Sequence, residues 1–179
     1  FPGTSLEPDA AFLLATADAA KGDVARGAAR LSELIDRGEA NPYWRQAILH
    51  RAHLYESHQQ LDAAEADYRR YVQSSSQSES QAQEATLRLI NLSYHLNHFD
   101  EAEAAAVELL EQPSLDPQIR QEVLYRHALV LIKLDRPADA LSSLGRLTND
   151  HPLSPYQAQV TYYRGLLMMS LNRHDEAVT

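Results

Sequence analysis

The sequence contains no cysteine and only six glycines in 179 residues. The absence of cysteine excludes disulfide bonds, thiolate metal sites and thiol nucleophiles. The glycines form neither a phosphate-cradling loop nor a GxSxG nucleophile elbow. The chain therefore lacks the local motifs that identify the common nucleotide-binding and hydrolytic enzymes. We expect no enzyme activity and no cofactor.

Long apolar runs and clusters of basic residues are also missing. No apolar run approaches the roughly 20 residues that span a bilayer, so no membrane insertion is expected. The net charge is −9 and the pI is near 5.3, with arginine and lysine spread among acidic residues. An acidic chain without a basic patch repels the phosphate backbone, which argues against nucleic acid as a partner.

Eight histidines raise the question of a metal site. His50 and His53 are three residues apart, as are His95 and His98, so each pair can share one face of a helix. Zinc sites in proteins normally take at least three protein ligands, and the HExxH arrangement is absent. We expect these histidines to be structural or solvated, and no metal to bind.

What the sequence does contain is a repeat. The segments "LNHFDEA" (96–102), "LDRPADA" (134–140) and "LNRHDEA" (171–177) share a leucine, a polar turn and an acidic residue before alanine. The small residue after each acidic turn recurs every 37 or 38 positions, at Gly27, Ala64, Ala102, Ala140 and Ala177. A period of this length is typical of stacked helical hairpins.

Each repeat is expected to form two helices joined by a short turn. Apolar residues follow the small residue at i+4 and i+7, as Leu144 and Leu147 follow Ala140, which places them on one helix face. Gly22 and Asn97 tolerate a left-handed turn, and Pro137 suits the first turn of a helix. The first helices are expected at about 8–21, 44–58, 83–96, 119–134 and 156–171.

The repeats extend over the whole chain. The stretch "SSSQSESQ" (74–81) has the length of the other inter-repeat junctions, so we interpret it as a junction rather than a domain boundary. The sequence thus predicts a single all-α domain over residues 1–179. Its repeats are expected at about 8–43, 44–82, 83–119, 120–156 and 157–179.

The fourth repeat resembles the tetratricopeptide repeat family. The residues that carry the resemblance are Leu124, Ala128, Leu131, Ala140, Leu144, Leu147 and Pro152. The second repeat shares Ala52, Tyr55, Ala64 and Tyr68, and the fifth shares Gly165, Met168 and Ala177. The resemblance implies a right-handed superhelical solenoid of about five antiparallel hairpins, the last one incomplete. Small residues in facing helices let their axes approach to about 8–10 Å.

Two features depart from the family pattern. Arg51, His127 and Arg164 stand before the small residue of the first helix, where the family usually has leucine. Either their stems run along a neighbouring helix and reach water, or the first helices are rotated. The period also exceeds the usual ~34 residues. The longer period and the run from Asn149 to Gly165 are similar to repeats of bacterial cell-envelope proteins. This resemblance implies a complex in the periplasm or at the outer membrane rather than a cytoplasmic protein.

The resemblance implies a concave groove, lined by the first helices, that binds a peptide or a partner helix. The groove positions are Leu49, His53, Leu87, Asn91, Tyr94, Tyr125, Leu129, Tyr162 and Met169, with Phe12 and Leu166 beside them. Tyrosine and methionine suit such contacts because they combine apolar area with adaptable or polar ends. The carboxylate clamp of chaperone-binding members is disfavoured, because Phe12, Leu49 and Leu87 stand where that clamp would place lysine.

We therefore expect a non-catalytic scaffold for protein partners. Two alternatives stay open. The chain stops inside the second helix of the fifth hairpin, so we expect a fragment of a longer array whose uncapped ends can pair with a second copy. In the other alternative, the array is the regulatory arm of an enzyme encoded outside these residues.

Overall fold

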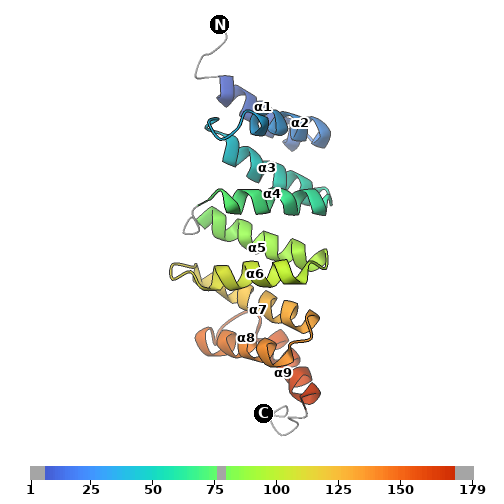
Figure 1. Cartoon of the computed structure of the whole chain (residues 1–179), viewed down its shortest axis with the longest axis vertical. Helices are drawn as coiled ribbons and strands as arrows, with labels where there is room; N and C mark the ends of the chain where they lie inside the picture. Colours follow the sequence, from blue (N-terminus) through green and yellow to red (C-terminus); the bar gives the residue numbers. More distant parts are fainter. Residues whose placement is uncertain (1–6, 76–79, 172–179) are drawn as a thin grey trace. The chain divides into compact units, whose positions relative to one another are not determined.

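The computed structural model describes residues 7–75 and 80–171, and within these ranges the chain is helical and contains no strand (Figure 1). The predicted all-α helical-repeat fold is confirmed. The helices pair into successive antiparallel hairpins, and Ala177 of the predicted fifth hairpin lies outside the described residues. Their bounds are α1 (Glu7–Ala20), α2 (Val24–Asp36), α3 (Trp44–Ser57), α4 (Leu61–Gln73), α5 (Ser80–His95), α6 (Phe99–Leu110), α7 (Pro117–Lys133), α8 (Pro137–Asp150) and α9 (Gln157–Ser170).

The turns inside four hairpins share one backbone conformation. Each contains a residue with positive φ, at Gly22, Gln59, Asn97 or Asp135. The next residue donates its N–H to a carbonyl five positions back, as Gln60 does to Tyr55 at 2.9 Å, and also serves as the N-cap of the second helix. This is the Schellman arrangement that ends many helices. The turn therefore ends one helix and starts the next within three residues.

Small residues allow the two helices of a hairpin to approach closely. A Cβ added at Gly27 on α2 would lie 3.1 Å from atoms of Ala19 on α1. The first helices have Ala15, Ala52 and Ala128 at their contact with the second helices, and all three are fully buried. The facing alanines on the second helices, also fully buried, are Ala64, Ala102 and Ala140.

Helix starts differ slightly from those predicted. Helix α7 begins at Pro117, because the Asp116 carboxylate accepts hydrogen bonds from the backbone N–H groups of Gln118 and Ile119 (2.7 and 3.2 Å). Proline in the first helical turn has no N–H to leave unpaired. Helix α8 begins at Pro137, as predicted.

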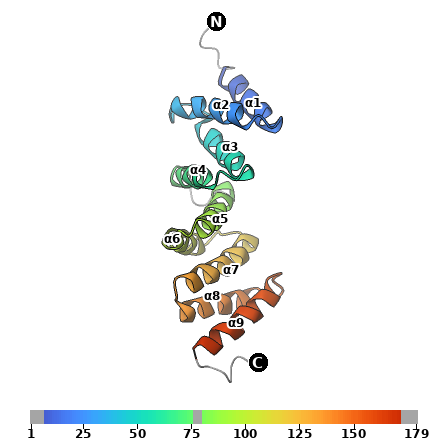
Figure 2. The same ribbon diagram turned by 90° about the vertical axis from the view of Figure 1, so that its right-hand side faces the viewer.

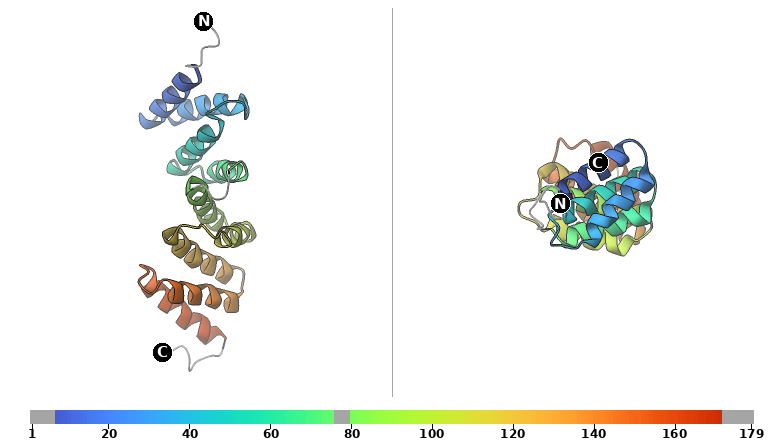
Figure 3. Two further views of the ribbon diagram at one scale, coloured as in Figure 1. Left: turned by 90° about the vertical axis from the view of Figure 1, so that its left-hand side faces the viewer. Right: turned by 90° about the horizontal axis from the view of Figure 1, so that it is seen from above.

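The chain divides into two compact units, residues 1–76 and 77–179. The division falls within the "SSSQSESQ" stretch that the sequence presents as a junction; the single-domain organisation stays a prediction, and each unit is described by itself. In the first unit α2 packs against α3 (Figure 2). In the second unit α6 packs against α7 and α8 against α9 (Figure 3). The core of the second unit is mainly leucine, valine and alanine.

The polar residues at the unusual first-helix position bond to the second helix. Arg51 on α3 donates two hydrogen bonds of 2.7 Å to Asp67 on α4 and one of 2.6 Å to the Ser32 hydroxyl. In the fourth hairpin, His127 Nδ1 lies 2.9 Å from Ser143 Oγ. The neighbouring alanines Ala52 and Ala128 are fully buried, so these helices are not rotated. Arg51 therefore reaches a carboxylate inside the hairpin, and neither expected arrangement describes it.

Candidate functional site

The predicted groove residues are divided between the two units. Leu49 and His53 lie on α3 of the first unit. On the first helices α5, α7 and α9 of the second unit lie Leu87, Asn91, Tyr94, Tyr125, Leu129, Tyr162 and Met169. Each of these residues lies on the first helix of its hairpin, as predicted, whereas a role in binding stays a prediction. Most of the set is in the second unit, and the site is built there.

In the first unit, the exposed His53 is hydrogen-bonded to a buried tyrosine. The hydroxyl of Tyr68, which is fully buried, lies 2.6 Å from His53 Nδ1 and donates to Glu56 Oε2 at 2.6 Å. A hydroxyl has one proton to donate, so His53 donates to Tyr68 from Nδ1. Phe12, also expected beside the groove, stacks on Tyr43 with ring centroids 4.9 Å apart. Both side chains thus contact neighbouring residues within this unit, and a role in binding stays a prediction for each.

In the second unit, four tyrosines form a cluster on α7, on α9 and at the N-cap of α9. Tyr125 stacks on Tyr156, with ring centroids 4.8 Å apart and ring planes 14° apart, and lies 6.4 Å from Tyr163. Tyr163 in turn meets Tyr162 edge-on at 5.4 Å. We call Tyr125, Tyr156, Tyr162 and Tyr163 the tyrosine cluster. Tyr156 and Tyr163 were not among the predicted residues, and Tyr156 is the N-cap residue of α9 rather than part of the helix.

Burial raises the pKa of Tyr125 and of Tyr156 above the ordinary value for tyrosine. For Tyr125, the neighbouring hydroxyl of Tyr163 adds to this effect, because two phenolates close together would repel one another. Both hydroxyls are therefore protonated at neutral pH. A neutral phenol can donate a hydrogen bond to a carbonyl group of a partner while its ring provides apolar contact area.

Helix α9 exposes a row of large apolar side chains. Tyr162, Leu166 and Met169 are 63%, 46% and 55% exposed, and their spacing of four and three residues places them on one helix face. We call these three residues the α9 stripe. Contiguous exposed apolar side chains commonly mark interaction surfaces. By contrast, Tyr125 and Leu129 on α7 are half-buried.

Asn91 on α5 has unused hydrogen-bonding capacity. Its Oδ1 atom is buried and accepts no hydrogen bond from the described residues. Buried polar atoms without a partner are uncommon in folded proteins. Leu87, one turn earlier on α5, packs instead against the hydrophobic core of the unit.

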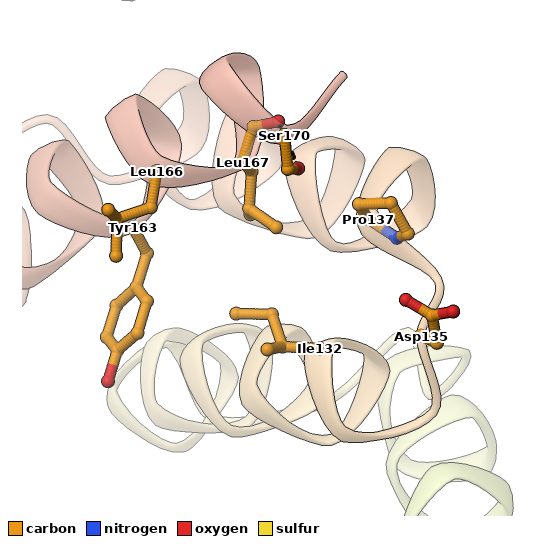
Figure 4. Close-up of a pocket in the computed structure, with 7 residues that line it drawn as sticks. All are labelled: Ile132, Asp135, Pro137, Tyr163, Leu166, Leu167 and Ser170. Atoms are coloured by element: carbon orange, nitrogen blue, oxygen red, sulfur yellow. Dashed lines mark hydrogen bonds between the residues drawn. The ribbon is translucent and has the colours of Figure 1, made fainter. Parts of the chain in front are cut away.

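A pocket of about 390 Å³ opens between α7, the start of α8 and α9 (Figure 4). Ile132 and Leu167 face each other across it, and Tyr163 and Asp135 lie at opposite ends. The remaining lining residues are Pro137, Leu166 and Ser170. The Ser170 hydroxyl donates to the Leu167 carbonyl at 2.7 Å. This pocket was not predicted, because Ile132 and Asp135 lie outside the predicted set.

Among the residues that the structure describes, no three histidine, aspartate or glutamate side chains gather as metal ligands would. Across the same residues, no helix combines the length and hydropathy needed to cross a membrane. The second unit instead offers aromatic rings, hydroxyl donors, apolar walls and a carboxylate.

Comparison with known proteins agrees with this architecture. The family model described as "Tetratricopeptide repeat" matches residues 122–154, which cover the fourth repeat. A search of curated proteins by sequence gave no match.

Several solved structures share the fold at low sequence identity. A MamA protein has a TM-score of 0.76 at 15% identity, over 98% of this chain and 88% of that one. A tetratricopeptide repeat protein from Parabacteroides merdae has a TM-score of 0.73 at 16% identity, over 95% and 62%. YrrB, described as a tetratricopeptide protein with an unusual peptide-binding site, has a TM-score of 0.70 at 14% identity, over 93% and 79%.

Proposed function

We propose that this chain, which carries a tetratricopeptide repeat and has the fold of proteins built from such repeats, is a non-catalytic scaffold. It binds an extended peptide or a partner helix on the first helices of its second unit. The observation that carries this proposal is the α9 stripe beside the tyrosine cluster. The peptide-binding site described for YrrB supports the use of this fold for such a ligand.

The energetics favour a partner that covers the stripe. Tyr162, Leu166 and Met169 now face water, and burying a large apolar side chain contributes about 1.5–3 kcal/mol. The protonated hydroxyls of the tyrosine cluster can then satisfy backbone carbonyls of the bound segment, which avoids the cost of burying them unpaired. Aromatic residues are frequent among the few that dominate binding energy at interfaces.

Selection from a displayed random peptide library tests the proposal. We expect the wild-type chain to enrich a consensus peptide whose affinity falls at least about tenfold in the Tyr125→Ala/Tyr162→Ala variant, because two ring contacts are lost. Circular dichroism should show unchanged helicity. Leu153→Ala is the matched control, since Leu153 is 97% exposed but lies in a junction between helices. Equal affinity in the double variant, or no consensus, would contradict the proposal.

A second copy of the chain is the alternative occupant of the α9 stripe. Light scattering separates the two candidates, because a peptide scaffold stays monomeric when its stripe is intact. A dimer that Met169→Ser dissociates would favour self-association instead.

We also propose that the scaffold acts in the bacterial cell envelope. The resemblance of residues 149–165 to repeats of envelope proteins supports this location. Fractionation of the native protein tests it, and recovery in the cytoplasmic fraction would contradict it.

A further inference from the structure

The pocket between α7 and α9 has a counterpart one hairpin earlier. Counting back 38 residues, Tyr94 corresponds to Ile132 and Asn97 to Asp135. The backbone conformations at these positions also match. Asn97 and Asp135 both have positive φ, and each donates its N–H to the carbonyl of Tyr94 or Ile132 at 3.2 Å. The two places can therefore be compared side chain by side chain.

In the α5–α6 hairpin an aromatic ring occupies this place. Tyr94 meets Phe99, the first residue of α6, edge-on with ring centroids 5.8 Å apart. Tyr94 is also close enough to Tyr125 on α7 to contribute to its raised pKa. In the α7–α8 hairpin the corresponding residues are the smaller Ile132 and Pro137, and both line the pocket of about 390 Å³ (Figure 4).

The same comparison shows an added charge. The neutral Asn97 is replaced by Asp135, whose carboxylate is exposed and makes no hydrogen bond or ion pair with the described residues. The adjacent Arg136 already bonds to Asp139 at 2.8 Å and to Glu103. Lys133, two positions earlier, makes no ion pair with Asp135. Compared with the α5–α6 hairpin, the pocket therefore has no ring at the position of Tyr94 and has an additional negative charge that no cation of the described residues pairs with.

We infer that this pocket takes a phenylalanine or tyrosine side chain of the bound segment, and that a lysine or arginine beside it in that segment pairs with Asp135. This inference rests on the proposed scaffold function and names the chemistry of its partner. The walls formed by Ile132, Leu166 and Leu167 suit a ring, and Tyr163 at one end offers an edge-to-face contact. The ring of the ligand then takes the place that the Tyr94 ring has in the earlier hairpin. Its cation pairs with Asp135, whereas the neutral Asn97 of the earlier hairpin needs no such partner.

Labelled peptides test the inference by fluorescence anisotropy. The probe is Gly-Ser-Lys-Phe-Lys-Ser-Gly, compared with versions in which the phenylalanine is leucine or alanine, or both lysines are glutamate. We expect the phenylalanine peptide to bind at least about tenfold more tightly than the alanine one, a difference of about 1.4 kcal/mol. The glutamate version should bind several-fold more weakly than the lysine one, with a difference that shrinks as salt is raised.

Two substitutions convert this pocket into its counterpart. Ile132→Tyr places a ring where Tyr94 has one and should abolish the preference for phenylalanine over alanine. Asp135→Asn reproduces Asn97 and should abolish the preference for lysine over glutamate. Lys133→Gln, on the same turn, is the control for charge and should leave both preferences intact. Thermal unfolding checks that each variant folds.

The outcomes separate this inference from the proposed function. If Ile132→Tyr keeps the preference for phenylalanine, or if the leucine peptide binds as tightly, the pocket inference is wrong. Loss of binding in the Tyr125→Ala/Tyr162→Ala variant would still support the scaffold. If none of the peptides binds more tightly than about 1 mM, the pocket inference is wrong, and the library selection judges the scaffold independently.

Discussion

The α3–α4 and α7–α8 hairpins reach the same backbone arrangement with different side-chain chemistry. In α3–α4, the position before the buried alanine of the first helix is Arg51, which bonds to Asp67 sixteen residues later. In α7–α8, the matching residues are His127 and Ser143, joined by a contact of 2.9 Å. The first pair is charged and bidentate, whereas the second is a single hydrogen bond.

The α5–α6 hairpin, which lies between them in the sequence, has apolar residues at the same position. Leu89 and Ala105 stand where the other two hairpins have polar pairs, and Leu89 is buried. A buried alanine on the second helix and a left-handed turn residue are common to the compared hairpins, whereas this position varies. The hairpin therefore requires a small contact residue on its second helix and a matched pair at this position, but no particular chemistry for that pair.

Breaking the charged pair should have the largest effect on stability. Asp67→Ala leaves the Arg51 guanidinium, whose side chain is only 15% exposed, without its carboxylate. Removing one partner of a buried ion pair typically lowers the free energy of unfolding by about 3–5 kcal/mol. Urea denaturation measures the loss.

The third hairpin supplies the control for this change. Arg51→Leu/Asp67→Ala reproduces the pair Leu89 and Ala105, and should recover most of the lost stability because no charge is left unpaired. A double variant as unstable as the single one would show that the positions are not interchangeable.

Overfilling the helix contact should have an intermediate effect. Ala140 on α8 is fully buried, so Ala140→Leu should lower the free energy of unfolding by about 1–3 kcal/mol through overpacking. Ala138→Leu on the exposed face of the same helix is the matched control and should change stability by less than about 0.5 kcal/mol. Similar losses in both variants would refute a close helix contact at Ala140.

The smallest effect should be a dependence of stability on pH that comes from His127. Arg51, at the equivalent position of its hairpin, cannot produce this dependence. Burial lowers the pKa of His127 below its ordinary value of 6.5, so the unfolded chain binds this proton more readily than the folded one. The stability it contributes is present above pH 6.5 and is lost as the pH falls below that value. For one proton the slope cannot exceed about 1.4 kcal/mol per pH unit.

Urea denaturation of wild type and His127→Gln at pH 7.5 and 5.5 tests this. We expect a smaller loss of stability on acidification in the variant. Burial also lowers the pKa of His50, which gives both proteins a common background of the same sign. Equal losses in the two proteins would remove His127 as a source of the pH dependence.

Much of the fold could be predicted from local pattern. The spacing of small residues located the hairpins, and the left-handed turns at Gly22 and Asn97 followed from residue type. Gln59 and Asp135 adopt the same conformation without being glycine or asparagine, because the repeat fixes the turn more strongly than the residue does. The bonding of Arg51 was not foreseen, since its partner depends on the register between two helices.

The candidate site could be predicted only in part. The first helices carry the expected tyrosines, but the pocket beside α9 is lined by Ile132 where the earlier hairpin has the larger Tyr94. Both are large side chains with apolar bodies, and a pattern of apolar positions treats them alike. Tyr156 was missed because it lies in a junction, as the N-cap residue of α9, where helix periodicity gives no orientation.

The shared turn restricts where the length of this chain can change. Gly22 precedes Gly27 by five residues, and the same distance separates Gln59 from Ala64, Asn97 from Ala102 and Asp135 from Ala140. An amino acid inserted within that distance would swing the second helix by about 100° about its own axis and carry its buried face into water. Insertions, deletions and genetically encoded tags should therefore be tolerated between hairpins and rejected inside them.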